Sequence, residues 1–267
     1  MKYYKLSKSD NINLIGSGKN MDNNLFDKEI YFIRHGETLW NVLGKYQGQE
    51  ADIKLNEKGI KQSKISGKYL QKFRCNDIKF DCVISSPLKR CKKTAKIICK
   101  YIDYDKSNII YMNEISEIKK GNMSGLSKND DLIIKFDKLF NEKINSIIDP
   151  IDNYRYIYSV LDGYALVNDI INDNNLDISG LETYDEIIDR TNYFIDYLQK
   201  TDKRKILVVS HSGYLETLLQ TIFKLGVLPY GDFTPGKNCS ICYCTLKDDI
   251  FSMISPLNTE HLSIDFD

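Results

Sequence analysis

Two of the three histidines in this 267-residue chain follow apolar segments in the same way. His35 comes directly after "EIYFIR", and His211 comes directly after "KILVVS". Arg34 precedes the first histidine, and Arg90 stands in "SSPLKR", which continues another apolar segment, "FDCVISS". A neutral imidazole can attack phosphorus, and guanidinium groups bind phosphoryl oxygens without losing their charge. These residue types in this arrangement predict phosphoryl-transfer chemistry.

Two further roles complete such a site. The leaving alkoxide needs a proton, and Glu117, in the loop segment "ISEIKKGNMSG", is the predicted proton donor. His211 is predicted to donate a hydrogen bond to the phosphoryl oxygens as negative charge spreads over them. This scheme requires no metal ion.

Short strands alternate with helices from residue 29 onward. The apolar patterns predict strands at 29–33, 80–86, 108–112 and 204–210, helices at 56–73, 87–102, 183–200 and 214–226, and a hairpin at 239–255. This alternation predicts an α/β fold of three layers, with a mostly parallel central sheet and helices on both faces. Because parallel strands share one carboxyl edge, both histidines are expected to meet there.

The chain is predicted to contain one catalytic domain, at 29–267, preceded by a polar N-terminal arm at 1–28. Residues 126–180 are rich in Asn, Asp and Ile, and their hydrophobic periodicity is weak. They are predicted to form a mostly helical insertion over the carboxyl edge of the sheet. An insertion at that edge would shape the substrate site.

Composition excludes several classes of function. Lys plus Arg and Asp plus Glu both total 37, which argues against nucleic-acid or membrane-surface partners. We expect no transmembrane helix and no signal peptide, because no apolar run reaches about 18 residues and the N-terminus lacks an apolar core. Seven scattered cysteines fit reduced thiols in the cytoplasm. The expected partner is a small phosphorylated metabolite, and an oligomer is compatible with the sequence.

Six segments, in order, resemble the motifs of the histidine phosphatase (phosphoglycerate mutase-like) superfamily. They are "RHGETLWN", "YQGQEADIKLNEKGIKQ", "SSPLKRCKKTA", "EIKKGNMSG", "LETYDEIIDR" and "VVSHSG". The resemblance runs from about residue 29 to the end of the chain, and it implies His35 as the phosphorylated nucleophile. Glu117 corresponds to the proton donor of the family, because Gly121 and Gly125 follow at the expected spacing. The implied phosphate-binding residues are Arg34, Arg90, His211 and Asn41, and the implied substrate contacts are Thr38, Gln47, Gly48, Lys128 and Ser212.

The superfamily contains both phosphatases and cofactor-dependent phosphoglycerate mutases. Lys128, in "GLSK", matches a lysine that mutases keep. Mutases also carry an adjacent arginine pair where this chain has "NEKINS", and His-Gly-Asn where it has "HSG". These departures favour hydrolysis of a small phosphate monoester, with no cofactor. The alternative is a mutase that interconverts 2- and 3-phosphoglycerate and requires 2,3-bisphosphoglycerate.

A non-catalytic binding module is a third interpretation. The presence of the whole predicted catalytic set argues against it: Arg34, His35, Arg90, Glu117 and His211. Two other features are interpreted as structural. Cys239 and Cys242, in "CSICYC", are expected on opposite faces of a strand, which argues against a shared metal ion. His261 has no motif around it and is expected at the surface.

Overall fold

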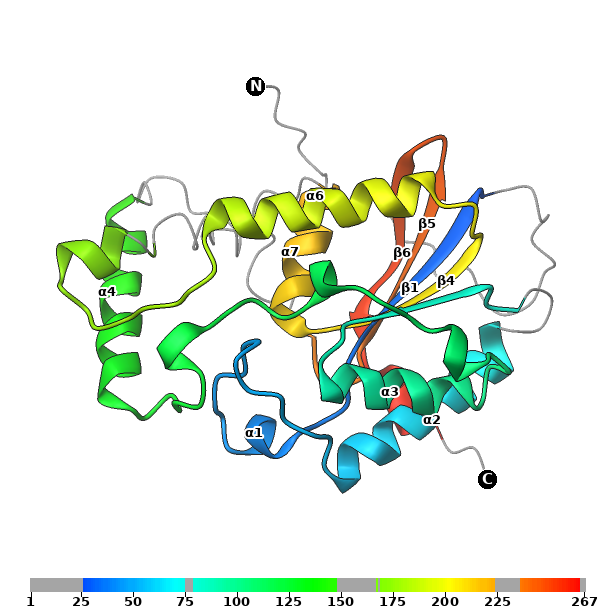
Figure 1. Cartoon of the computed structure of the whole chain (residues 1–267), viewed down its shortest axis with the longest axis horizontal. Helices are drawn as coiled ribbons and strands as arrows, with labels where there is room; N and C mark the ends of the chain where they lie inside the picture. The colour runs from blue at the N-terminus through cyan, green and yellow to red at the C-terminus, as the bar shows by residue number, and fades with distance from the viewer. Residues whose placement is uncertain (1–25, 75–78, 148–166, 168, 224–235, 265–267) are drawn as a thin grey trace, which may run out of the picture.

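The structure, a computed structural model, describes residues 26–74, 79–147, 167, 169–223 and 236–264 (Figure 1). Within these residues the centre is a six-stranded sheet in the order β3-β2-β4-β1-β5-β6. Its strands are β1 (Lys28–Arg34), β2 (Cys82–Ser85), β3 (Ile110–Tyr111), β4 (Lys205–Ser210), β5 (Ile241–Lys247) and β6 (Ile250–Asn258). The first four run parallel to one another, and β5 and β6 pair antiparallel. The predicted mostly parallel sheet is therefore confirmed.

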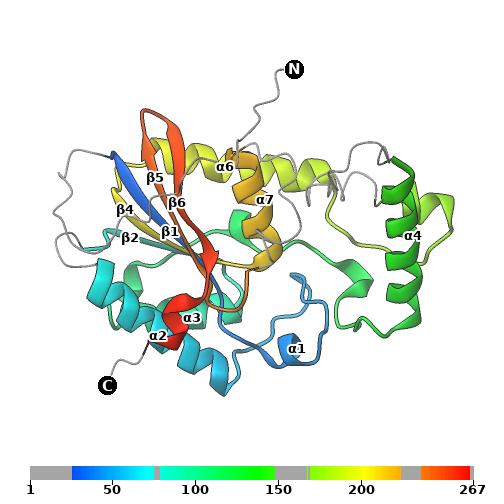
Figure 2. The ribbon, with the colours of Figure 1, turned by 180° about the vertical axis from the view of Figure 1, so that it is seen from behind.

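Helices cover both faces of this sheet (Figures 1 and 2). α2 (Glu57–Arg74) and α3 (Lys89–Cys99) lie on one face, and α6 (Tyr184–Lys200) and α7 (Ser212–Phe223) lie on the other. Tyr31 and Ile33 of β1 pack into the core with α2 and α3, whereas Ile30 and Phe32 pack into the core with α6 and α7. Because successive strand side chains point to opposite faces, one apolar strand contributes to both cores. The predicted three-layer arrangement is confirmed.

The register of the parallel strands sets the position of the site. Arg34, the last residue of β1, pairs with Ser210, the last residue of β4. Ser85, at the end of β2, pairs with Val209. All three strands therefore end at nearly the same level, and the residues that follow them share one edge of the sheet.

The C-terminal hairpin forms as predicted. Asp248 and Asp249 join β5 to β6 with φ angles of 49° and 61°. Two consecutive residues with positive φ match the twist of a tight hairpin turn. Cys239 packs into the core under α2 and α3, whereas Cys242 packs into the opposite core. The two thiols are separated as expected, but Cys239 lies before β5, with a φ angle of 59°, and not on the strand.

The segment 126–180 is helical in much of its described part. α4 (Asp131–Ile147) and residues 169–173 are helical, and α4 stands away from the sheet in both views (Figures 1 and 2). Four residues of this segment and Met123, which lies just before it, form a third, smaller core. The four are Ile133, Ile170, Leu176 and Ile178. That this segment is an insertion stays a prediction.

The remaining elements are short. They are α1 (Leu39–Val42) and 3-10 turns at Lys106–Asn108, Asn113–Ile115, Gly121–Met123 and Glu260–Ser263. The predicted strand at 108–112 is reduced to the two residues of β3, which lie exposed at the sheet edge. Residues 1–25 of the predicted arm, and Gly226 at the predicted end of α7, lie outside the described residues.

The expectation that His261 lies at the surface is wrong. Its side chain is buried, its Nε2 lies 2.9 Å from the Oγ of Ser66, and its ring lies 5.1 Å from that of Tyr69. The 3-10 turn that carries His261 packs against α2, which a motif search along the chain cannot detect. Among the helices of the described ranges, none is long and apolar enough to cross a membrane.

Candidate active site

The two histidines that follow β1 and β4 lie side by side. The rings of His35 and His211 have centroids 5.2 Å apart and meet edge to face at 62°. Both side chains are buried. The His35 N–H donates to the Ser210 carbonyl at 3.0 Å, which joins the two strand ends directly. The predicted meeting of both imidazoles at the carboxyl edge is therefore observed.

The tautomer of His35 is set by its neighbour. Its Nδ1 lies 2.8 Å from the carbonyl oxygen of Gly36, and a carbonyl can only accept a hydrogen bond. Nδ1 therefore carries the proton, and Nε2 keeps a free lone pair. Gly36 is required at this place, because a Cβ atom there would collide with the Gly59 carbonyl. This arrangement leaves Nε2 as the nucleophilic atom.

Both imidazoles are held in their neutral form. Burial lowers the pKa of His35 and of His211 well below the usual histidine range, and the charge of Arg90 lowers both further. Desolvation disfavours a cation, and a nearby cation disfavours a second one. A neutral imidazole is the form that can attack phosphorus.

Arg90 connects His211 to the loop that contains Gly48 and Ala51. It is fully buried in the first turn of α3, as predicted, and its Nε donates to Nδ1 of His211 at 3.1 Å. Its Nη1 and Nη2 donate to the carbonyls of Ala51 and Gly48, at 3.2 and 3.1 Å. Gly48 thus enters the site through its backbone.

Arg34 lies beside the nucleophile with unused donor capacity. Its Nη1 donates to the Gly236 carbonyl at 2.5 Å. Its Nε is buried and has no hydrogen-bond partner in the described part of the chain. Burial lowers the pKa of Arg34, whereas the negative charges of Glu117 and Glu216 oppose that shift. A buried guanidinium N–H without a partner fits an anionic ligand.

His211 has the tautomer opposite to that of His35. Because Nδ1 accepts from Arg90, Nε2 carries the proton and donates to the Oγ of Ser86 at 2.8 Å. The Cys91 thiol lies 3.3 Å from the same Nε2, and burial raises the pKa of this thiol well above its usual value. His211 is therefore a neutral hydrogen-bond donor with a single N–H, which Ser86 accepts in this structure.

Asn41 is fixed by the cap of α1. Its Oδ1 lies 3.1 Å from both the N and the Oγ1 of Thr38, and it accepts from Asn238 at 3.1 Å. The Oγ1 of Thr38 also lies 2.9 Å from the Oε1 of Gln47. Asn238 reaches the His35 carbonyl as well, at 3.2 Å. Thr38, Asn41 and Gln47 thus form one polar cluster next to the nucleophile.

Glu117 belongs to the loop after β3, and its side chain lies against the first turn of α7. Its Oε1 accepts the N–H groups of Ile118 and Tyr214, at 3.0 and 3.1 Å. Its main-chain carbonyl accepts from the side chain of Gln49 at 2.7 Å. A Cβ atom on Gly213 would lie 2.9 Å from the same Oε1, so the glycine gives the carboxylate room. The oxygen left for proton exchange is Oε2.

Two predicted substrate contacts differ in their surroundings. Ser212, the first residue of α7, donates its hydroxyl to Glu216 at 2.9 Å. Lys128 is exposed in the turn before α4, and its charge acts on Asp137 of that helix. The structure thus joins Ser212 to the polar groups around Arg34, whereas the role of Lys128 stays a prediction.

Several residues of the site were not found from the sequence. Ser86 and Cys91 lie inside or next to the "SSPLKR" segment, which signalled the region but not their contacts with His211. Asn238 carries no local signal, because it reaches the site from 197 positions beyond Asn41. Burial raises the pKa of Glu216, on the first turns of α7, to about 7.

The sequence model of the histidine phosphatase superfamily (branch 1) matches residues 30–143 and 165–258. A metal-independent phosphoserine phosphatase of Arabidopsis thaliana is 30% identical over 88% of this chain and 83% of its own length. The uncharacterized phosphatase PhoE of Bacillus subtilis is 37% identical, but the match spans only 36% of this chain and 46% of that protein.

Solved structures of phosphoglycerate mutase-like proteins have the same fold as this chain. The crystal structure of a phosphoglycerate mutase from Bacillus anthracis superposes with a TM-score of 0.67 at 21% identity. The superposition covers 88% of this chain and 95% of the other. The chain belongs to the histidine phosphatase superfamily.

Proposed function

We propose that the chain hydrolyses a small phosphate monoester through a phosphohistidine formed on His35. One observation carries this proposal. The proton of His35 is fixed on Nδ1 by the Gly36 carbonyl, so the lone pair of Nε2 is available between two arginines. An imidazole arranged in this way is a nucleophile, and the guanidinium groups match the charge of a phosphoryl group.

The first step transfers the phosphoryl group to the protein. Nε2 of His35 forms a bond to phosphorus while the bond from phosphorus to the ester oxygen breaks. Glu117, protonated on Oε2, gives its proton to that oxygen, and the alcohol leaves. Arg34 and Arg90 balance the charge on the phosphoryl oxygens. The N–H of His211, which donates to Ser86 in this structure, turns to those oxygens when the substrate is bound.

The second step restores the enzyme. Water attacks phosphorus as the bond from phosphorus to Nε2 breaks, and the Glu117 carboxylate accepts the proton of that water. Inorganic phosphate then leaves, and both residues return to their starting forms. Neither step uses a metal ion or a cofactor, and the metal-independent Arabidopsis relative supports this point.

Hydrolysis is favoured over mutase chemistry by the surroundings of the pocket. A mutase must hold an intermediate with two anionic groups, which needs fixed cations beyond the phosphoryl site. The arginine pair that mutases carry for that role is replaced by "NEKINS" in this chain. Lys128, which matches a lysine that mutases keep, is exposed, and its charge acts on Asp137. The relative that matches most of this chain is a phosphatase, and a phosphoglycerate mutase is among the similar structures, so the preference rests on the residues of the site.

The reaction is tested with a panel of phosphate monoesters, including O-phosphoserine and 3-phosphoglycerate, with His35→Ala as the blank. We expect release of inorganic phosphate that depends on His35, and little formation of 2-phosphoglycerate. Conversion of 3- to 2-phosphoglycerate faster than release of phosphate would instead establish a mutase. Phosphate release that persists in His35→Ala would contradict the phosphohistidine mechanism.

We further propose that the protein works in the cytoplasm on a small metabolite. The six cysteines of the described ranges are all free and buried, which fits a reducing compartment. The test is thiol labelling of denatured protein taken directly from cells, where every cysteine is expected to react without prior reduction.

A further inference from the structure

The segment "LETYDEIIDR" contributes two buried charges that the phosphoryl chemistry does not use. Glu182 precedes α6, and Arg190 lies two turns into that helix. Arg190 donates from Nε to Oε1 of Glu182 at 2.6 Å and from Nη2 to Oε2 at 3.0 Å. The two side chains are only 13% and 3% exposed. Burying such a pair is not an efficient way to gain stability, which raises the question of what it holds in place.

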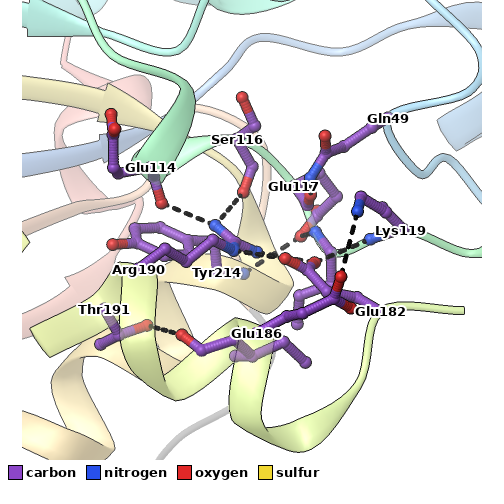
Figure 3. A network of polar contacts seen from close by, with 12 residues as sticks. Gln49, Glu114, Ser116, Glu117, Lys119, Glu182, Glu186, Arg190, Thr191 and Tyr214 are labelled. Atoms are coloured by element: carbon purple, nitrogen blue, oxygen red, sulfur yellow. Dashed lines mark hydrogen bonds and ion pairs between the residues drawn. The ribbon is translucent and has the colours of Figure 1, made fainter. Parts of the chain in front are cut away.

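The remaining donor of the arginine reaches the loop that carries Glu117. Nη1 of Arg190 donates to the carbonyls of Glu114 and Ser116, at 2.7 and 2.8 Å (Figure 3). Ser116 directly precedes Glu117. A rigid guanidinium that contacts two carbonyls of one loop fixes the course of that backbone.

The carboxylate of the pair holds the loop on the other side of Glu117. Oε2 of Glu182 accepts the N–H of Lys119 at 3.1 Å (Figure 3). The two charged side chains therefore hold the backbone immediately before and shortly after Glu117. Apart from the ion pair itself, these side-chain hydrogen bonds of Arg190 and Glu182 go to backbone groups of the loop that carries Glu117.

Arg190 also contacts the helix that hydrogen-bonds the catalytic carboxyl. Its guanidinium lies 4.5 Å from the centroid of the Tyr214 ring. The main-chain N–H of Tyr214 donates to Oε1 of Glu117. One buried arginine thus contacts both elements that determine where the carboxyl lies.

We propose that the Glu182–Arg190 pair is a positioning device for Glu117 as the proton donor. This inference rests on the role of Glu117 in the proposed function. Proton transfer requires the carboxyl within hydrogen-bond reach of the leaving oxygen, and a displacement of about 1 Å can cost on the order of 10²-fold in rate. Attack by His35 does not pass through this loop and is expected to continue.

The test measures how the rate depends on the leaving group. kcat/KM is determined for a series of substituted phenyl phosphates, from the 4-nitrophenyl ester to esters of more basic phenols. A nitrophenolate leaves without protonation, whereas a basic phenolate needs the proton from Glu117. Wild-type enzyme is expected to give a shallow dependence on leaving-group basicity, and Glu117→Gln a steep one.

Two variants disturb the ion pair. Arg190→Lys keeps the positive charge but loses the planar set of N–H donors, and Glu182→Gln keeps the shape of the side chain but loses the negative charge. Both are expected to steepen the dependence, with a loss of about 10²-fold for the most basic leaving group and little change for 4-nitrophenyl phosphate. The double variant Arg190→Lys with Glu117→Gln is expected to lose no more than Glu117→Gln alone for that basic leaving group.

Leu198→Val is the matched control, because this buried residue of α6 packs in the core under the sheet and stabilises the same helix. It is expected to lower the melting temperature and leave the dependence on leaving group unchanged. Suppose that Arg190→Lys and Glu182→Gln lose the same factor in kcat/KM for all leaving groups, while Glu117→Gln shows a steep dependence on leaving-group basicity. This result would overturn the positioning role of the pair and leave the proposed function standing. A shallow dependence in Glu117→Gln would instead overturn the role of Glu117 in the proposed function.

Discussion

The phosphate-binding side and the proton-donor side of this site are built in different ways. Arg34, His35 and His211 stand at the ends of buried strands, where the main chain already fixes them. Glu117 stands on an irregular loop. The Arg190 side chain of α6 holds the carbonyl of the residue before it, and a main-chain N–H of α7 holds its carboxylate. Strand ends therefore supply positions that need little further support, whereas a loop residue needs support from elsewhere in the chain.

The largest effect expected for every substrate alike concerns the phosphate side. Arg90→Met removes a donor to the phosphoryl group and leaves His211 Nδ1 and two loop carbonyls without their partner. We expect kcat/KM to fall on the order of 10²–10³-fold or more, equally for every leaving group. The neighbouring Lys89→Met breaks only an exposed ion pair with Asp52 and should retain full activity.

Glu117→Gln is expected to behave in the opposite way. The amide keeps the shape of the carboxyl but supplies no proton, so the loss should reach about 10²–10⁴-fold for basic leaving groups. For 4-nitrophenyl phosphate the first step should continue at nearly the wild-type rate. A uniform loss across the series would erase the distinction between the two sides of the pocket.

This difference also explains what sequence analysis could predict. The residues at strand ends were found because apolar strands and their ends are local patterns, and a parallel sheet brings such ends together. Glu117 was predicted from its place on a loop after a strand, and the resemblance to a family then supported that choice through the spacing of Gly121 and Gly125. Nothing local marks a loop carboxyl as buried. The ion pair of Glu182 with Arg190 joins residues whose partners lie more than 60 positions away.

The sheet and its covering helices were predicted because the apolar residues of each strand and each helix recur with a clear period. The strand at 108–112 was predicted too long. Its two strand residues are exposed at the edge of the sheet that the described residues form. His261 was placed wrongly, because its burial depends on the packing of the C-terminal turn against Ser66 and Tyr69 of α2.

Acidification provides a smaller test, confined to the phosphate side. The folded-state pKa values of His35 and His211 lie below the unfolded value near 6.5, so the unfolded chain binds more protons as the pH falls below that value. Stability is therefore expected to fall as the pH drops from about 7 to 5. Urea unfolding at both pH values should show a smaller loss for His35→Asn. Nitrogen-15 spectra that show cationic rings at pH 6 would contradict this account.

The smallest expected effect concerns Glu216. Burial raises its pKa to about 7, so the folded state binds an extra proton between the ordinary carboxyl pKa and about 7. Its ionisation therefore costs stability as the pH rises through this window. Glu216→Gln should match wild type near pH 4.5 and melt slightly higher at pH 8. The exposed Glu142→Gln is the control, and equal behaviour of the two variants would refute this assignment.

The phosphoenzyme itself tests the account most directly. In Glu117→Gln, 4-nitrophenyl phosphate should phosphorylate His35 quickly, whereas hydrolysis of the phosphoenzyme lacks its base. Rapid-quench measurement should then show a burst of nitrophenolate equal to the enzyme concentration, with acid-labile phosphate on the peptide that contains His35. The absence of a burst together with phosphate on any other residue, His211 included, would contradict the central claim.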